Sequence, residues 1–424
     1  MDNKTDIKRD YLWNTIGSGI YALMSMVLAF AAMNIAGPDD GGVFSFGFSA
    51  FGQQIFIIAY FGIRPFHITD SEYEYSYSEY RRLRRFTCLA AAAAAAVFLC
   101  AMFAAGRYTW RKAAVIFLLS LYKIADGAAD LYESECQRAG ALWLGGKELT
   151  FRTLSAGGSL ILVLLLTKDV LTASAAAVLV QTGWIVFFRS HIAGLISEQG
   201  KGMGAFRLAG STVLLFLSVF LDFYIFSASK YAIDLHMTDA DSGIFNILFM
   251  PTSVIYLAAN FIIRPFMTRL SSVYESGDLD SFEKTVRSLT LAVGAMGAAA
   301  AMGAALLGRF CLGILELILG AGYEGLLTEN SNAFFLIILG GGFYAAACLF
   351  YYVLVIMRRQ KLLFVIYLIA AAAAFGMTDI FVVNYGLMGA AAAYPVYMCI
   401  ISVLFAAGSR ICLRKERQKR TFGE

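Results

Sequence analysis

The chain has 424 residues, of which 59% are hydrophobic and 15% are charged, and its mean hydropathy is +0.68. Soluble domains carry about 25% charged residues, so this composition excludes an ordinary water-soluble core and indicates an integral membrane protein. The apolar runs are nearly continuous and about 20 residues long, which favours helices over the shorter alternating strands of a membrane barrel. The net charge of +4 is modest, and we expect no nucleic-acid partner.

In chain order, twelve apolar runs are long enough to cross a bilayer. An apolar piece at 310–320 is too short to span and is expected to be interfacial or re-entrant. The sequence therefore predicts an all-α integral membrane protein with twelve transmembrane helices, at 11–36, 43–63, 86–106, 112–134, 148–167, 170–190, 208–228, 243–263, 286–308, 331–356, 361–383 and 386–408.

The basic residues indicate an orientation. If the N-terminus is cytoplasmic, 27 of the 34 lysines and arginines fall on the cytoplasmic side, six, including Lys230, fall on the opposite side, and Lys123 lies inside a span. Positive charge is enriched in the cytoplasmic loops of membrane proteins. We therefore expect a multi-pass protein of the bacterial cytoplasmic membrane with both termini in the cytoplasm. The first run is too long for a cleavable signal peptide, so it is predicted to be retained.

The chain contains a sequence repeat. Ile-Arg-Pro-Phe occurs at 63–66 and again at 263–266, each time at the end of the second helix in a set of six. Gly-Val-Phe and Gly-Ile-Phe open those two helices, and a cytoplasmic loop of mixed charge follows each Arg-Pro. An even number of spans inserts both copies in the same direction, which is the parallel type of repeat found in transporters. The predicted lobes are residues 1–200 and 201–424.

The fourth predicted span carries the densest set of ionisable groups. Its polar residues are spaced by three or four positions, which places them on one helical face. Charges at membrane depth are costly and usually face a cavity, so this face is a candidate substrate cavity. A structural salt bridge and a helix end that protrudes into the cytosol are the alternatives. The polar residues on this face of the fourth predicted span are Lys123, Asp126, Asp130, Glu133 and Gln137.

Other polar residues in or near the spans complete the candidate cavity. Asp222 is a lone carboxylate in the seventh span, and Arg152 lies near the start of the fifth. Arg64 and Arg264 occupy equivalent places in the two lobes and could receive an anionic head group entering from the cytoplasm. Anchoring or packing roles are the alternatives for these charges. Amide side chains able to meet sugar hydroxyls are Gln53, Gln54 and Asn260, and Asn34 ends the first span.

Signals of enzymatic chemistry are weak. The three histidines show no metal-ligand spacing, and no nucleotide-binding, nucleophile-elbow or zinc-protease motif is found. The seven cysteines lie mostly in apolar runs, as small hydrophobic residues do. We therefore expect a protein that is not an enzyme, with no cofactor and no metal site. A coupling ion, H⁺ or Na⁺, is compatible with the sequence, which does not identify it.

Two stretches, 13–70 and 229–282, resemble bacterial polysaccharide flippases of the MOP (multidrug/oligosaccharidyl-lipid/polysaccharide) exporter superfamily. Both contain the helix that ends in Ile-Arg-Pro-Phe. The resemblance implies two six-helix lobes around a central, often cationic cavity that works by alternating access. It also implies a lipid-linked oligosaccharide of the undecaprenyl-diphosphate type as cargo, moved to the outer leaflet for cell-surface polysaccharide biosynthesis. Membrane lipids and other polysaccharide-assembly proteins are the implied partners.

One departure from that family concerns the first span. Relatives often carry an arginine near its end, where this chain has Asn34. Any cationic role must therefore fall to Lys123, Arg152 and the paired arginines Arg64 and Arg264.

Three other functions stay open. A cation-coupled multidrug or small-molecule efflux transporter of the same superfamily would use an acidic pocket, which Asp126, Asp130 and Asp222 could form. A membrane glycosyltransferase or glycan ligase would need a larger catalytic loop than this chain contains. A purely structural membrane scaffold would have little use for costly charges inside its spans.

Overall fold

The computed structural model describes residues 3–70, 72–196 and 198–422, and these are almost entirely helical. The chain divides into two compact units. The first contains residues 1–220 and 238–243, and the second contains residues 221–237 and 244–424. The division falls inside a helix and at the start of the next, whereas the predicted lobe boundary lies after residue 200. That boundary stays a prediction.

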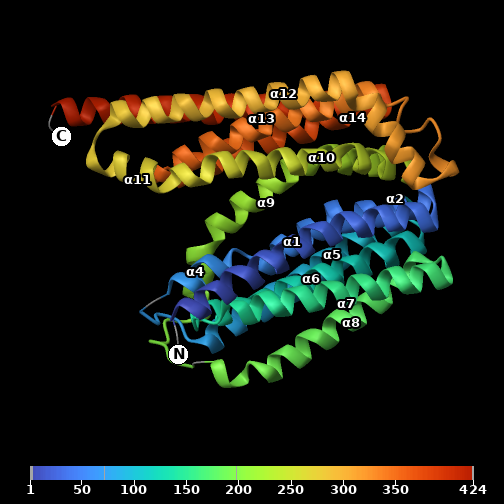
Figure 1. Ribbon diagram of the computed structural model, residues 1–424, viewed down its shortest axis with the longest axis horizontal. Helices are drawn as coiled ribbons and strands as arrows, with labels where there is room; N and C mark the ends of the chain where they lie inside the picture. Colours follow the sequence, from blue (N-terminus) through green and yellow to red (C-terminus); the bar gives the residue numbers. More distant parts are fainter. Residues whose placement is uncertain (1–2, 71, 197, 423–424) are drawn as a thin grey trace. The chain divides into compact units, whose positions relative to one another are not determined.

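In the described part of the first unit, five helical segments are long and apolar enough to cross a membrane, and the more highly charged α6 is the sixth. The second of the six is built from several short helices (Figure 1). Glycines and alanines recur along these segments, and such small residues let helix backbones approach closely. The elements are α1 (Asn3–Ala36), α2 (Pro38–Phe46), a π-helical turn (Gly47–Phe51), α3 (Gly52–Tyr60), α4 (Ile63–Thr69), α5 (Tyr77–Ala104), α6 (Trp110–Arg138), α7 (Leu142–Thr167) and α8 (Val170–His191).

The second unit begins within α9 and also holds six segments. The last element bends at Gly386, whose backbone has φ 57° and ψ −139°, so it consists of two consecutive spans. Glycine adopts this positive φ without the steric penalty of a Cβ atom. The elements are α9 (Ala205–His236), α10 (Asp239–Ile263), a 3₁₀ turn (Arg264–Phe266), α11 (Met267–Ser276), α12 (Leu279–Leu319), α13 (Ser331–Ile356) and α14 (Gln360–Phe422).

Within the described residues, ten helical segments are long and apolar enough to cross a membrane when α14 counts once. The bend in α14 and the more highly charged α6 bring the number to the predicted twelve, so the all-α fold class is confirmed. One detail was wrong. The piece at 310–320 is not a separate re-entrant element, because α12 continues unbroken to Leu319 and ends at Gly320, where φ is 96°.

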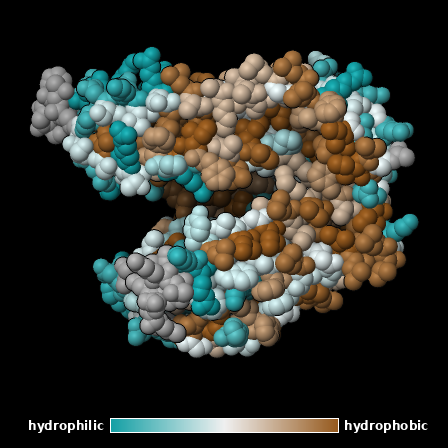
Figure 2. All heavy atoms as spheres, viewed as in Figure 1, coloured by the Kyte–Doolittle hydropathy of each residue, from teal (hydrophilic) through white to brown (hydrophobic). Residues whose placement is uncertain are grey.

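The outward faces of the helices are apolar. Large hydrophobic side chains are exposed along α12, for example Leu291, Leu306 and Leu317. Figure 2 shows apolar atoms over much of the visible surface of the helices. In water such a surface would drive aggregation, whereas in a bilayer it contacts lipid chains. The molecule is a multi-pass membrane protein, while its orientation and its membrane of residence stay predictions.

Side-chain caps fix several helix starts. Ser76 and Glu79 form a reciprocal capping box at α5. Asp169 caps α8 by accepting a hydrogen bond of 2.9 Å from the backbone N–H of Thr172, and Arg111 Nη2 lies 2.7 Å from Asp169. Burial alone would raise the pKa of Asp169, but the hydrogen bonds from Arg111 and Thr172 lower it to about 2.

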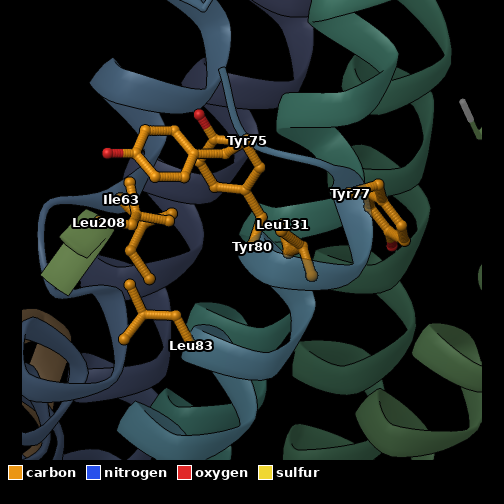
Figure 3. Packing of buried hydrophobic residues seen from close by; sticks show 7 residues of the cluster. All are labelled: Ile63, Tyr75, Tyr77, Tyr80, Leu83, Leu131 and Leu208. Carbon is orange, nitrogen blue, oxygen red and sulfur yellow. The ribbon is translucent and has the colours of Figure 1, made fainter. Parts of the chain in front are cut away.

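A hydrophobic core rich in tyrosine lies within the first unit. It joins α4, the start of α5, α6 and the start of α9, and most of its side chains gather in one place, whereas Tyr77 lies to one side (Figure 3). The segment before α9 is fastened to the same region, because Lys201 N–H donates to the Tyr73 carbonyl at 2.9 Å and Gly204 N–H donates to Glu79 Oε1 at 2.5 Å. The core residues are Ile63, Tyr75, Tyr77, Tyr80, Leu83, Leu131 and Leu208.

Candidate functional site

Helix α6 carries a row of charged side chains into the interior of the first unit. Lys123, Asp126, Asp130 and Glu133 are all buried. Each contacts a partner from another helix or from its own next turn. The sequence spacing that placed these residues on one face therefore corresponds to one interior network.

Asp126 is the most connected carboxylate of this network. Arg152 Nη1 of α7 donates to its Oδ1, and Gln181 Nε2 of α8 donates to the same oxygen at 2.6 Å. The hydroxyl of Tyr21 on α1 donates to Oδ2 at 3.0 Å. Four helices of the first unit, α1, α6, α7 and α8, are thus joined at one buried carboxylate.

Arg152 is enclosed by acidic residues. Besides Asp126, its Nη2 lies 3.0 Å from Glu133 Oε1 and its Nε lies 2.8 Å from Glu148 Oε1. A buried guanidinium satisfies its five N–H donors best with several oxygen acceptors, and these three carboxylates supply them. The arrangement is a stable ion cluster rather than an open positive site.

Asp130 joins two further arginines. Arg64 Nη1 lies 2.8 Å from Asp130 Oδ1, and Arg84 Nη2 lies 2.8 Å from Asp130 Oδ2. Arg64 also reaches Glu133 at 3.2 Å, and its Nη2 donates to Gln137 Oε1 at 3.1 Å. Both arginines are therefore neutralised by the α6 row.

Lys123 lies among aromatic rings. Its Nζ is 4.0 Å from Asp126 Oδ2, 3.3 Å from the Tyr21 hydroxyl and 4.0 Å from the centroid of the Phe48 ring. The residue is 2% exposed. A lysine in this position is a counter-ion within the network, which agrees with the salt-bridge alternative, and its role in a substrate cavity stays a prediction.

The second unit presents a carboxylate in a different environment. Asp222, near the middle of α9, accepts a hydrogen bond of 3.0 Å from the Tyr344 hydroxyl on α13. Among the residues that the structure describes, no basic side chain forms an ion pair with it. Tyr344 stacks on Tyr256 of α10 with ring centroids 5.6 Å apart. Asp222 is thus held by tyrosine rather than by a cation.

Asn260 lies next to the same tyrosines. Its Nδ2 donates to the Tyr256 carbonyl at 2.9 Å, and its Oδ1 accepts from the Tyr352 hydroxyl at 3.0 Å. Two of the residues proposed from sequence, Asp222 and Asn260, therefore meet in one tyrosine cluster of the second unit. Tyrosines of α10 and α13 form this cluster, and we call it the tyrosine cluster: Tyr256, Tyr344 and Tyr352.

The remaining candidates lie elsewhere. Gln54 is buried in the first unit and donates to the Phe220 carbonyl at 3.0 Å. Gln53 is half-buried, and Asn34 is exposed at the end of α1. Arg264 is exposed, unlike its sequence equivalent Arg64. The candidates therefore belong to two sites in two units, and their predicted role in a cavity stays a prediction.

Sequence reasoning missed four members of the α6 network: Tyr21, Arg84, Glu148 and Gln181. Arg84 belongs to the run Arg-Arg-Leu-Arg-Arg, which looks like a cytoplasmic anchor, yet it is only 2% exposed. Glu148 could have been found, because it lies four positions before Arg152 and such pairs meet on one helix face.

Comparisons with known proteins identify the fold. No protein-family model matches the sequence, and no curated protein matches it. Several solved structures match nearly the whole chain. A mutant form of the MATE transporter VcmN of Vibrio cholerae is 12% identical, with 97% of this chain and 98% of that one covered and a TM-score of 0.60.

A multidrug resistance MATE family transporter of the MOP superfamily, in its inward-facing conformation, is 10% identical, with 96% and 95% covered and a TM-score of 0.56. A MOP superfamily transporter from Pyrococcus furiosus is 12% identical, with 98% and 97% covered and a TM-score of 0.51. The latter is described by a binding pocket whose reverse polarity suggests a different function. The chain therefore has the two-lobe fold of MOP superfamily transporters.

Proposed function

We propose that this protein is a cation-coupled transporter of the MOP type that exports organic cations, with Asp222 as the carboxylate that binds the positive charge. The observation that carries the proposal is the absence of a basic partner for Asp222 among the described residues, in the middle of an apolar helix. A carboxylate at that depth is costly. A cationic cargo would supply the missing counter-ion.

The tyrosine cluster suits such a cargo. Tyr344 and Tyr256 present stacked rings beside Asp222, and the faces of aromatic rings attract organic cations by about 0.5–2 kcal/mol. A carboxylate with neighbouring aromatic faces combines charge attraction with apolar contact. Both terms favour a bulky, poorly hydrated cation over a small inorganic one.

The flippase interpretation receives less support. A diphosphate head group needs basic side chains that are available to it, and those of the α6 network are not, because Arg64, Arg84, Arg152 and Lys123 are each within 4.0 Å of a carboxylate. The structural neighbours include a transporter described by the words multidrug resistance, and none of those compared above is described as a flippase. No contact among the described residues points specifically to the flipping of a lipid-linked oligosaccharide.

The α6 network offers a site for coupling. It joins four basic and four acidic side chains, so protonation of any one carboxylate would leave a buried arginine or lysine short of a partner. Such a network responds to the loss or gain of one charge. We propose that the driving cation acts in the first unit while the cargo binds in the second.

The test is uptake of tetraphenylphosphonium by proteoliposomes under an imposed H⁺ or Na⁺ gradient. Asp222→Asn removes the charge-assisted contact between the carboxylate and the cationic cargo. We therefore expect it to lower uptake roughly tenfold or more. Asp379→Asn is the matched control, because Asp379 is half-exposed and pairs with His236 on the same unit. It should transport normally.

Two results would overturn the proposal. One is uptake by Asp222→Asn at the rate of the unmodified protein. The other is no uptake by the unmodified protein under either gradient, combined with accumulation of lipid-linked oligosaccharide in a host that lacks the gene. The second result would restore the flippase interpretation.

A further inference from the structure

A second charge on α9 lacks a counter-ion. Lys230 follows Asp222 by eight residues and is 7% exposed, and its Nζ lies 4.6 Å from the centroid of the Phe249 ring on α10. Among the described residues, no acidic side chain forms an ion pair with Lys230 and no side chain or backbone carbonyl accepts a hydrogen bond from it. One turn earlier, the hydroxyl of Ser227 is fully buried and has no hydrogen-bond partner within the part of the chain that the structure describes.

Lys123 of the first unit makes the contrast clear. Both lysines are buried and both lie over a phenylalanine ring, at 4.0 and 4.6 Å. Lys123 also has a carboxylate and a tyrosine hydroxyl within reach, whereas Lys230 has the ring alone among the described residues. A cation–π contact offsets only part of the cost of burying an ammonium group. The environment of Lys230 is therefore incomplete without an anion.

An aromatic row connects Lys230 to Asp222. Phe226 lies between them on α9, and its ring centroid is 5.0 Å from Tyr344 and 5.0 Å from Phe249. Tyr344 holds Asp222, and Phe249 lies under Lys230. Along the second unit, the carboxylate of Asp222 is thus followed by the rings of Tyr344, Phe226 and Phe249. The ammonium group of Lys230 comes after these three rings.

Helix geometry sets the spacing of the two charges. Eight residues advance about 12 Å along an α-helix and return to within about 80° of the starting direction. Side chains on a helix lean toward its N-terminus, so the long lysine side chain reaches back toward Asp222. The charged atoms are therefore separated by no more than about 12 Å along the axis, which is the length of a drug-sized molecule.

We infer that the second unit binds a zwitterionic cargo, whose amine or quaternary nitrogen pairs with Asp222 and whose carboxylate pairs with Lys230 and Ser227. The apolar middle of the cargo lies along Tyr344, Phe226 and Phe249. This inference rests on the proposed function and narrows it from organic cations to cations that carry an acidic group. Ser227 donates the hydrogen bond that its hydroxyl otherwise lacks.

The test compares two probes that differ only in the anionic group: tetramethylrhodamine with its free carboxylate, and the methyl ester of the same dye. Binding to the purified protein in nanodiscs is followed by fluorescence polarisation. We expect the unmodified protein to bind the zwitterion roughly tenfold more tightly, which corresponds to about 1.4 kcal/mol. Lys230→Gln should abolish this preference and keep the affinity for the ester.

A second variant protects the test against misfolding. Ser227→Ala removes one hydroxyl from a buried site with little change in volume, and it should reduce the preference for the zwitterion about threefold. Asp222→Asn should weaken both probes alike. The inference is overturned if the unmodified protein binds the ester as well as the zwitterion, or if folded Lys230→Gln or Ser227→Ala keeps the full preference. In those cases binding of the ester leaves the proposed function intact, whereas failure to bind either probe refutes both.

Discussion

Arg64 Nη1 lies 2.8 Å from Asp130 Oδ1, while Arg264, the equivalent arginine of the repeated Ile-Arg-Pro-Phe, is exposed. The arginine of the motif therefore occupies different environments in the two units, whereas Ile63 and Ile263 are both fully buried. In the first unit the motif lies beside the charged face of α6. The repeated motif opens α4 in the first unit, whereas in the second unit it begins at the last residue of α10 and continues into a 3₁₀ turn.

The two arginines form a natural pair for mutagenesis. Arg64→Ala removes one partner from Asp130 and Glu133 and should lower the free energy of unfolding by about 1–3 kcal/mol. Arg264→Ala should change it by no more than about 0.5 kcal/mol, because the side chain is exposed. Melting temperatures of the two variants in the same detergent check this. Equal melting temperatures would contradict the structural difference.

Much of the fold could be predicted because apolar runs of about 20 residues have few alternatives in a bilayer. The errors have physical causes. The piece at 310–320 was separated from the preceding span because each span was given the length that a bilayer requires, whereas α12 runs without a break from Leu279 to Leu319. The spans 361–383 and 386–408 were predicted as separate helices, and the structure joins them at the bend of Gly386, because hydropathy does not distinguish a bend from a loop.

The charged residues were harder to assign. The spacing of the charged residues on α6 indicated that they share one face of the helix, and in the structure their hydrogen-bond and ion-pair partners lie along that face. Arg84 was missed because hydropathy reports composition and not the direction in which a side chain points, and only the packing of α5 against α6 brings Arg84 to Asp130. Lys230 was assigned to an external loop by its position in the sequence, whereas α9 continues past it and buries it.

Arg152 should be among the most important residues for stability. Arg152→Met would leave Asp126, Glu133 and Glu148 without their shared cation inside the protein. Removing one partner of a buried ion cluster costs about 3–5 kcal/mol. The measurement is thermal unfolding of the purified variant, or its yield of monodisperse protein if it is too unstable to melt cooperatively.

Arg417→Ala is the control for charge removal as such. Arg417 is half-exposed and pairs with Asp280 and Glu283, and surface pairs contribute about 0–1 kcal/mol. If Arg152→Met unfolds at the same temperature as Arg417→Ala, the cluster around Arg152 does not stabilise the protein as described.

Gly42, in the middle of α2, packs closely against the backbone of Asp239 and Gly243 at the start of α10. A Cβ atom on Gly42 would overlap the carbonyl oxygen of Asp239 and would lie 3.3 Å from the backbone N of Gly243. Backbone atoms cannot move aside as a flexible side chain can, so Gly42→Ala should cost about 1–3 kcal/mol through overpacking. Gly19→Ala is the matched control, since nothing lies within 4 Å of its Cβ position and alanine favours a helix. A melting temperature of Gly42→Ala equal to that of Gly19→Ala would show that the helices can separate at no cost.

The lowered pKa of Asp169 predicts a small dependence of the protein's stability on pH. The hydrogen bonds from Arg111 and Thr172 lower its pKa to about 2, against about 3.9 for an unfolded aspartate. Because the folded-state pKa is the lower one, the stabilisation is fully present above pH ~4 and is lost as the pH falls through about 2. The side chain is 31% exposed, so solvent screening limits the contribution to less than about 1 kcal/mol.

Asp169→Asn isolates this contribution, because asparagine is an equally good helix cap and keeps the bond to Thr172 while removing the charge that Arg111 contacts. The variant should melt below the unmodified protein at about pH 6, and about half of that difference should be gone at about pH 3. A difference that stays constant over this range would assign the effect to the shape of the side chain instead. A difference that grows toward acidic pH would mean that the folded state raises the pKa of Asp169, which is the opposite of what its contacts with Arg111 and Thr172 require.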